Sequence, residues 1–278
     1  MSVAFSPPQT IIEAGSGARR YWQEMWRYRE LLLFLSWRLL LIRYKQTVLG
    51  VAWALSRPLL TLCIVTLIFS RFAGLPSDGV PYALLVIAGL LPWQFFAGAL
   101  TESSGILIDN ANLLTKVYFP RLLLPASAWL LCLVDFLVSA VILIGLMVWY
   151  GHGPTWKIVT LPLFLLLLLG ASFGAGLWVA ALNVRYRDFR HLVPFVVQFG
   201  LYLSPVGFSL TLVPEHWRWL YALNPMVGII DGFRWCLLDT GVSLHWPGIL
   251  VSALCVAVLA ISGLRYFQRT EHSLADII

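Results

Sequence analysis

Residues that could carry out chemistry are few in this chain of 278 residues, and they are scattered along it. The sequence contains no D-x-D pair and no H-E-x-x-H motif, and its five histidines lie far apart. Acid–base chemistry on a glycan would need paired carboxylates. The apolar segments offer only Asp135 near the middle of a stretch long enough to cross a membrane. A membrane enzyme acting on lipid-linked glycans is therefore a disfavoured alternative.

Asp135 has two interpretations. An acid at the middle of a bilayer costs about 2.5–3.5 kcal/mol on insertion scales, so its side chain should face protein or water. It could be a proton or substrate site, or it could be a structural acid paired within the chain, with Arg234 or with a polar group of a spanning segment as its partner. We favour the structural interpretation, because one isolated carboxylate makes a poor relay. Glu102 is expected at the inner end of its segment, within reach of solvent.

Nucleotide and metal sites are not expected. No phosphate-binding loop of the form G-x-x-x-x-G-K-[ST] is present, and none of the three lysines, Lys45, Lys116 and Lys157, follows a glycine. If ATP drives the activity, ATP and Mg²⁺ must be held by another polypeptide. The four cysteines show no C-x-x-C spacing, so the sequence predicts neither a metal centre nor a disulfide.

The composition is that of an all-α polytopic membrane protein. The chain is 60% hydrophobic and 12% charged, and its mean hydropathy is +0.83, whereas a soluble domain is about 25% charged. The net charge of +6 could indicate nucleic acid. However, the basic residues lie beside apolar segments rather than on one face, so no nucleic acid is expected.

Six apolar stretches reach the length of about 20 residues that a membrane-spanning helix needs. They are Val51–Phe72, Pro81–Leu100, Leu122–Trp149, Ile158–Leu182, Leu192–Phe208 and Trp246–Phe267. If the N-terminus is inside, only Arg71, Lys157, Arg218 and Arg234 of the 19 Lys and Arg residues fall outside. Lys and Arg accumulate on the cytoplasmic side, so both termini are predicted to be cytoplasmic.

The N-terminal region, residues 1–48, is predicted to be a cytoplasmic tail and an interfacial amphipathic helix. Ala18–Glu30 mixes arginines with Trp and Met, which is typical of a segment at the membrane surface. Leu31–Ile42 is too short to cross and is expected to lie along that surface. Residues 49–268 form one transmembrane domain, and residues 269–278 form a second cytoplasmic tail.

Two connecting segments stand out. Gly105–Pro120 joins the second and third spans on the inner side, and its apolar residues up to Val117 and Tyr118 share one face at helical spacing. It is either a short linking helix or a lever that receives force from a cytoplasmic subunit. Pro214–Leu238 is apolar but broken, and its 25 residues cannot cross twice. Two short helices that enter the outer leaflet and return are predicted.

These stretches together resemble the membrane subunit of the ABC-2 polysaccharide exporters, the O-antigen and capsule permease family. The resemblance covers roughly Tyr21 to Phe267. The matching stretches are YWQEMWRYRELLLFLSWR at Tyr21–Arg38, RYKQTVLGVAWALSRP at Arg43–Pro58, GLLPWQFFAGALTESS at Gly89–Ser104, NANLLTKVYFPRLLLP at Asn110–Pro125, and LNPM at Leu223–Met226.

The resemblance implies a half-transporter in the bacterial inner membrane. Two copies would form a channel, and two separate ATPase subunits would bind below it. The cargo would be a long glycan on an undecaprenyl diphosphate carrier, moved from cytoplasm to periplasm. The segment 105–118 would contain the coupling helix. Its ATPase-coupling residues would be Ile106, Leu107, Asp109, Asn112, Leu113, Lys116 and Tyr118.

The resemblance also makes 214–238 the pair of re-entrant helices at the outer mouth. The residues of this outer gate would be Asn224, Pro225, Asp231 and Arg234.

A moving sugar chain needs flat apolar faces to slide along and dispersed hydrogen-bonding groups. Aromatic residues make up 14% of the chain. Most should face lipid or form interfacial belts, so only a minority should line a channel. The candidates for the channel and its entrance are Arg43, Lys45, Trp53, Phe69, Phe72, Trp93, Phe95, Phe96, Tyr202 and Phe208.

Two further alternatives stay open. An ABC-2 permease could carry another cargo, such as a teichoic acid, a drug or a small lipid. A secondary transporter usually shows internal repeats and intramembrane acids, and no repeat is detected.

Overall fold

The computed structural model describes residues 18–45, 51–186 and 188–271, and these residues contain no β-strand. Five helices in this part of the chain are long and apolar enough to span a membrane. Three of them are single helices: α4 (Tyr82–Asp109), α6 (Leu123–Trp149) and α11 (Trp246–Glu271). The fourth, Leu55–Phe72, combines most of α3 (Val51–Thr66) with a π-helical turn (Leu67–Phe72). The fifth combines α7 (Leu161–Arg185) with the short helix before it (Trp156–Thr160).

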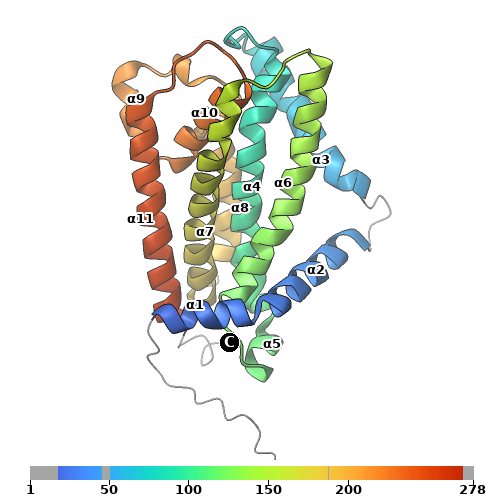
Figure 1. Cartoon of the computed structure of the whole chain (residues 1–278), viewed down its shortest axis with the longest axis vertical. Helices are drawn as coiled ribbons and strands as arrows, with labels where there is room; N and C mark the ends of the chain where they lie inside the picture. Colours follow the sequence, from blue (N-terminus) through green and yellow to red (C-terminus); the bar gives the residue numbers. More distant parts are fainter. Residues whose placement is uncertain (1–17, 46–50, 187, 272–278) are drawn as a thin grey trace, which may run out of the picture.

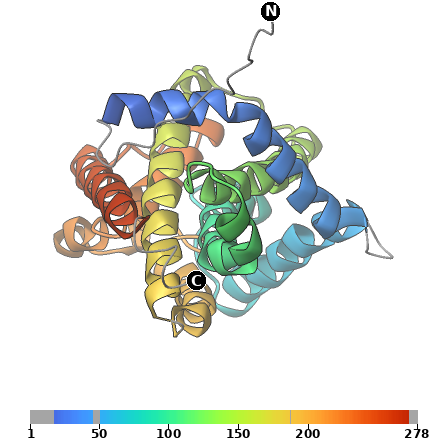
Figure 2. The same cartoon turned by 90° about the horizontal axis from the view of Figure 1, so that it is seen from below.

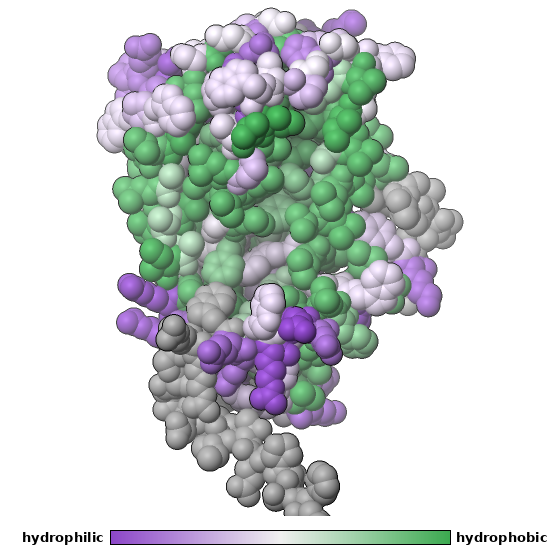
Figure 3. Space-filling view, viewed as in Figure 1, coloured by the Kyte–Doolittle hydropathy of each residue, from purple (hydrophilic) through white to green (hydrophobic). Residues whose placement is uncertain are grey.

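The arrangement of these helices is that of a multi-pass membrane protein. In Figure 1, α4, α6, α7 and α11 stand side by side, with α1 and α5 at the lower end and α9 at the upper end. Figure 3 shows a broad apolar band between two more hydrophilic ends, as expected for a surface that faces lipid. The prediction of an all-helical polytopic protein is confirmed.

The fifth predicted span, Leu192–Phe208, does not form one long helix. Helix α8 covers Phe189–Leu203, and its 15 residues extend about 22 Å at 1.5 Å per residue. The helix ends because Ser204 takes an extended conformation, φ −107° and ψ 150°, as is usual before a proline. The prediction of six spanning helices is therefore not confirmed for the described residues.

The N-terminal region forms two helices, α1 (Ala18–Arg27) and α2 (Arg29–Lys45). Helix α1 lies across the lower end of the bundle, whereas α2 rises obliquely beside α6 (Figures 1 and 2). Leu35 anchors α2, because it is buried in a cluster with Leu122 and Leu123. Helix α2 thus leans against the bundle, and the position of Leu31–Ile42 along the membrane surface stays a prediction.

The packing of α7 against α11 depends on glycine. A Cβ atom on Gly174 would lie 2.5 Å from the backbone nitrogen of Ala260, and a Cβ on Gly170 would lie 2.9 Å from Val256. Gly263 on α11 faces the carbonyl of Gly174 in return. The two backbones therefore touch, as small residues permit in membrane bundles.

The broken segment near the upper end forms the two short helices that the sequence predicts, α9 (Glu215–Tyr221) and α10 (Pro225–Leu237). Arg234 of α10 is buried, and its guanidinium donates to the carbonyls of Leu85 at 3.1 Å and of Val206 and Phe208 at 2.7 Å each. Phe208 and Val206 belong to the non-helical stretch after α8. The carbonyls of Val206 and Phe208 lack helical hydrogen bonds, so Arg234 supplies their partner inside the protein.

Candidate functional site

A cavity of about 520 Å³ lies among α2, α3, α4, α6 and α8. Its volume is within the range of about 300–1,000 Å³ that is usual for ligand sites. Four charged side chains line it: Arg43 of α2, Arg57 of α3, Glu102 of α4 and Asp135 of α6. Helix α8 contributes the opposite wall through Val197, Gln198, Leu201 and Tyr202.

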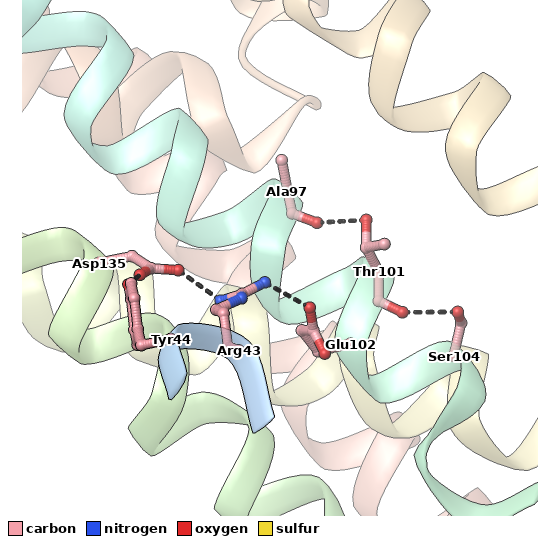
Figure 4. A network of polar contacts seen from close by, with 7 residues as sticks. All are labelled: Arg43, Tyr44, Ala97, Thr101, Glu102, Ser104 and Asp135. Carbon is pink, nitrogen blue, oxygen red and sulfur yellow. Dashed lines mark hydrogen bonds and ion pairs between the residues drawn. The ribbon is translucent and has the colours of Figure 1, made fainter. Parts of the chain in front are cut away.

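Three of these charges form one network on the cavity wall (Figure 4). The guanidinium of Arg43 donates to Asp135 Oδ2 and to Glu102 Oε1, each at 2.6 Å. The hydroxyl of Tyr44 donates to the other oxygen of Asp135 at 2.5 Å. The side chains of Arg43, Glu102 and Asp135 are 30%, 29% and 41% exposed, so a ligand in the cavity could reach them.

The network forms because three helices meet at one height. Helix α4 descends and α6 ascends, which brings Glu102 and Asp135 to neighbouring walls, and the end of α2 reaches them from the side (Figures 1 and 4). Asp135 is thus paired within the chain, as the structural interpretation held. Arg234 is not its partner, however, because Arg43 and the hydroxyl of Tyr44 hold this carboxylate.

The rest of the wall combines flat aromatic faces with neutral hydrogen-bonding groups. The aromatic residues are Tyr44, Trp93, Phe95, Phe136 and Tyr202. The neutral polar residues are Thr61, Gln94, Thr101, Ser139 and Gln198. Gly200 lets α8 approach this wall, since a Cβ there would lie 2.6 Å from the Trp93 ring. Such a surface suits a ligand with apolar faces and many hydroxyl groups.

The structure brings four of the ten channel candidates to the cavity: Arg43, Trp93, Phe95 and Tyr202. Tyr44, Phe136 and the two glutamines were missed. Tyr44 and Phe136 directly follow Arg43 and Asp135 in the sequence, and this adjacency was the available signal.

The other channel candidates lie elsewhere. Lys45 and Phe72 are exposed and do not line the cavity. Phe69 packs against Gly207, and Phe96 contacts Trp93 at a ring distance of 5.9 Å. Two more complete the list: Phe208, whose carbonyl accepts from Arg234, and Trp53, whose side chain lies outside the described residues.

The predicted coupling segment is not one helix. Helix α4 continues to Asp109, the chain turns at Asn110, and α5 (Ala111–Lys116) forms a separate short helix at the lower end of the molecule (Figure 2). The single apolar face predicted for this segment is therefore wrong, since Val117 and Tyr118 follow the end of α5 and are 50% and 57% exposed.

The individual coupling candidates divide into two groups. Ile106 and Leu107 are buried in the lower hydrophobic cluster, and Leu113 packs against it. Asp109, Asn112, Lys116 and Tyr118 are exposed at the lower end. Only the exposed group is accessible to another chain.

The outer-gate candidates gather around the start and middle of α10. The side chain of Asn224 accepts from the backbone of Met226 at 3.1 Å and donates to Ser204 at 3.0 Å, and Pro225 is the first residue of the helix. Asp231 lines a small cavity of about 50 Å³ with Arg234. Burial raises the pKa of Asp231 to about 6, against the opposing effect of Arg234.

One further motif is explained by packing. Gly170–Gly174 reads G-A-S-F-G and so matches the G-x-S-x-G pattern of serine hydrolases. That pattern needs a serine exposed on a sharp turn between a strand and a helix. Ser172 is instead buried inside α7, and both glycines face α11.

Comparisons with known proteins agree with this picture of a membrane transport subunit. The family model for the ABC-2 type transporter matches residues 30–238. The O-antigen export system permease protein RfbA of Myxococcus xanthus is 30% identical over 251 residues, which cover 90% of this chain and 96% of that protein. Its namesake in Klebsiella pneumoniae is 28% identical over 253 residues, 90% of this chain and 95% of that protein.

A third relative is the polysialic acid transport protein KpsM of Escherichia coli, which is 25% identical over 241 residues, covering 84% of this chain and 90% of that protein. The chain therefore belongs to the ABC-2 type transporter family. The family resemblance drawn from the quoted motifs is confirmed.

Proposed function

We propose that this chain is the membrane subunit of an ATP-driven exporter that moves a polysaccharide, linked to undecaprenyl diphosphate, from the cytoplasm to the periplasm. The observation that carries the proposal is the composition of the cavity wall, in a chain whose relatives are named for O-antigen and polysialic acid transport. Aromatic faces beside amide and hydroxyl groups allow a sugar chain to stack without tight, sequence-specific binding, as bases do on aromatic platforms.

In this proposal the cavity is one half of the channel. Helices α3 and α8 border the cavity and leave apolar side chains uncovered, such as Leu60 at 58% and Phe199 at 49% exposed. A second copy packed against this side would close the two cavities into one conduit. Crossing cargo would pass Trp93 and Tyr202 on the way.

The proposed orientation puts both termini in the cytoplasm of a bacterial cell, with the protein in the inner membrane. The basic residues concentrated at the end that carries α1 and α5 support this orientation. Helix α8 and the non-helical stretch after it would together make the fifth crossing. Helices α9 and α10 would then be the re-entrant pair at the periplasmic mouth.

The energy would come from a cytoplasmic ABC ATPase, present in two copies, that holds ATP and Mg²⁺. Its proposed contact is the exposed surface of Asp109, Asn112, Lys116 and Tyr118 around α5. Helix α4 connects this surface directly to Glu102 on the cavity wall. Movement of α5 would therefore reach the cavity through the turn at Asn110 and the length of α4.

Deletion of the gene tests the proposal. Lipid-linked glycan should accumulate on the cytoplasmic side of the deletion strain, and surface glycan should be lost. A plasmid carrying Trp93→Ala should restore export poorly, whereas Trp149→Ala, a tryptophan that is 82% exposed outside the cavity, should restore it fully. Normal surface glycan in the deletion strain would refute the function.

The ATPase contact has its own test. Replacing Asp109, Asn112 and Lys116 together with alanine should prevent co-purification of the ATPase and its stimulation by the membrane subunit. If assembly and stimulated hydrolysis both survive these changes, α5 is not the lever.

A further inference from the structure

The cavity wall carries equal numbers of positive and negative side chains, and three of these four side chains form ion pairs with one another. Two cations, Arg43 and Arg57, and two anions, Glu102 and Asp135, line the cavity, so its ionised side chains sum to zero. Both carboxylates contact the same guanidinium, that of Arg43, at 2.6 Å. Arg43 is therefore shared by two acids, and this cluster of three side chains carries one net negative charge.

We propose that this cavity selects for uncharged sugar residues and against acidic ones, and that Glu102 and Asp135 determine this specificity. The inference rests on the proposed function, since it specifies the class of polysaccharide that the cavity accepts. It concerns the charge of the sugar ring and not the lipid carrier.

An acidic sugar meets three penalties in this cavity. Its carboxylate loses water against a wall that includes Trp93, Phe95 and Phe136. It approaches two carboxylates of the same sign in a partly desolvated space, where like charges repel more strongly than in water. The guanidinium of Arg43 is already engaged by both acids, which leaves Arg57 as the remaining cation among the lining residues.

A neutral sugar meets none of these penalties. Its hydroxyl groups can donate to the carboxylate oxygens of Glu102 and Asp135 and to the amide oxygens of Gln94 and Gln198, all of which line the cavity. Its apolar ring faces can lie on the aromatic side chains. The cavity volume of about 520 Å³ admits a short run of sugars at a time. A chain with a carboxylate on every sugar would thus bring several negative charges in at once.

The test compares two trisaccharides of matched size. The full-length protein, in nanodiscs of zwitterionic lipid, is titrated with tritium-labelled galactotriose, which is neutral, and trigalacturonate, which carries a carboxylate on each ring. Scintillation proximity gives both dissociation constants. For the wild-type protein we expect galactotriose to bind about tenfold more tightly or better, and the ratio should fall as salt is raised.

Three variants locate the cause. Glu102→Gln with Asp135→Asn removes both negative charges from the wall, and the ratio should drop to about one or invert. Glu102→Gln alone should give an intermediate ratio, which keeps the test valid if the double variant does not fold. The control is Asp239→Asn, because Asp239 pairs with Lys157 at 2.7 Å away from the cavity, and its ratio should equal that of the wild type.

Each other outcome has a defined meaning. Equal binding of both trisaccharides by the wild-type protein, or an unchanged ratio in the folded acid variants, would overturn the charge selectivity and leave the proposed function standing. Binding of neither trisaccharide would overturn the charge selectivity of this cavity, whereas the export function is tested separately by the deletion strain.

Discussion

The contact between α7 and α11 gives the sharpest stability prediction, the effect of Gly174→Ala. The added methyl group would lie 2.5 Å from the backbone nitrogen of Ala260 and 2.6 Å from the carbonyl oxygen of Leu259. Both neighbours are backbone atoms, so no side-chain rotation can make room. The helices would have to separate by roughly 1 Å to restore ordinary van der Waals contact.

The loss of stability caused by Gly174→Ala follows from two opposing effects. Overpacking of a close-packed interface costs about 1–3 kcal/mol, and backbone-on-backbone contact puts this case at the upper end. Alanine regains at most about 1 kcal/mol of helix propensity over glycine. The net loss should be about 2 kcal/mol, which for a chain of this size lowers the melting temperature by about 4–8 °C.

The assay uses the cysteines. All four are free thiols, and Cys132 and Cys236 are buried, so a thiol-reactive dye reports unfolding of the purified protein in one detergent. The matched control is Gly145→Ala on α6, where the added methyl group meets nothing within 4 Å. A melting temperature for Gly174→Ala within about 1 °C of both the wild type and this control would refute the close approach.

Three further predictions concern charged side chains. Arg234→Met removes three hydrogen bonds to carbonyls and should lower stability by about 3 kcal/mol or more in the same dye assay, with partial recovery in Arg234→Lys. Because burial raises the pKa of Asp231 to about 6, its neutral form favours folding, and this contribution disappears as the pH rises through 6. The wild type should therefore gain melting temperature relative to Asp231→Asn when the pH falls from 7.5 to 5; no relative gain would contradict the assignment. Arg43→Gln leaves two carboxylates without their cation and should destabilise the protein by about 1 kcal/mol, a modest value because the site is partly exposed. Adding Asp135→Asn should recover part of this loss, and a purely additive loss would exclude the coupling.

Much of this protein is determined locally along its sequence. Uninterrupted apolar runs of about 20 residues are enough to predict spanning helices, because a bilayer selects for length and apolarity. Five of the six predicted spans have this form in the structure. The breaks around Asn224-Pro225 likewise predicted the two short helices α9 and α10, since neither half is long enough to cross. Gly170 and Gly174, four residues apart, have the spacing of small residues that permits close helix packing, and α7 contacts α11 through them.

The candidate site was decided only by the tertiary structure. Arg43 is 59 residues from Glu102 and 92 residues from Asp135 in the chain, and no periodicity connects three separate helices. Their meeting depends on α2 leaning against α6, a contact to which the buried Leu35 contributes. The sequence alone does not separate aromatic residues that line the cavity from those that face lipid, because both kinds lie in apolar segments. Only the packing of α8 against α4 separates Trp93 and Tyr202, which line the cavity, from Phe72, which does not.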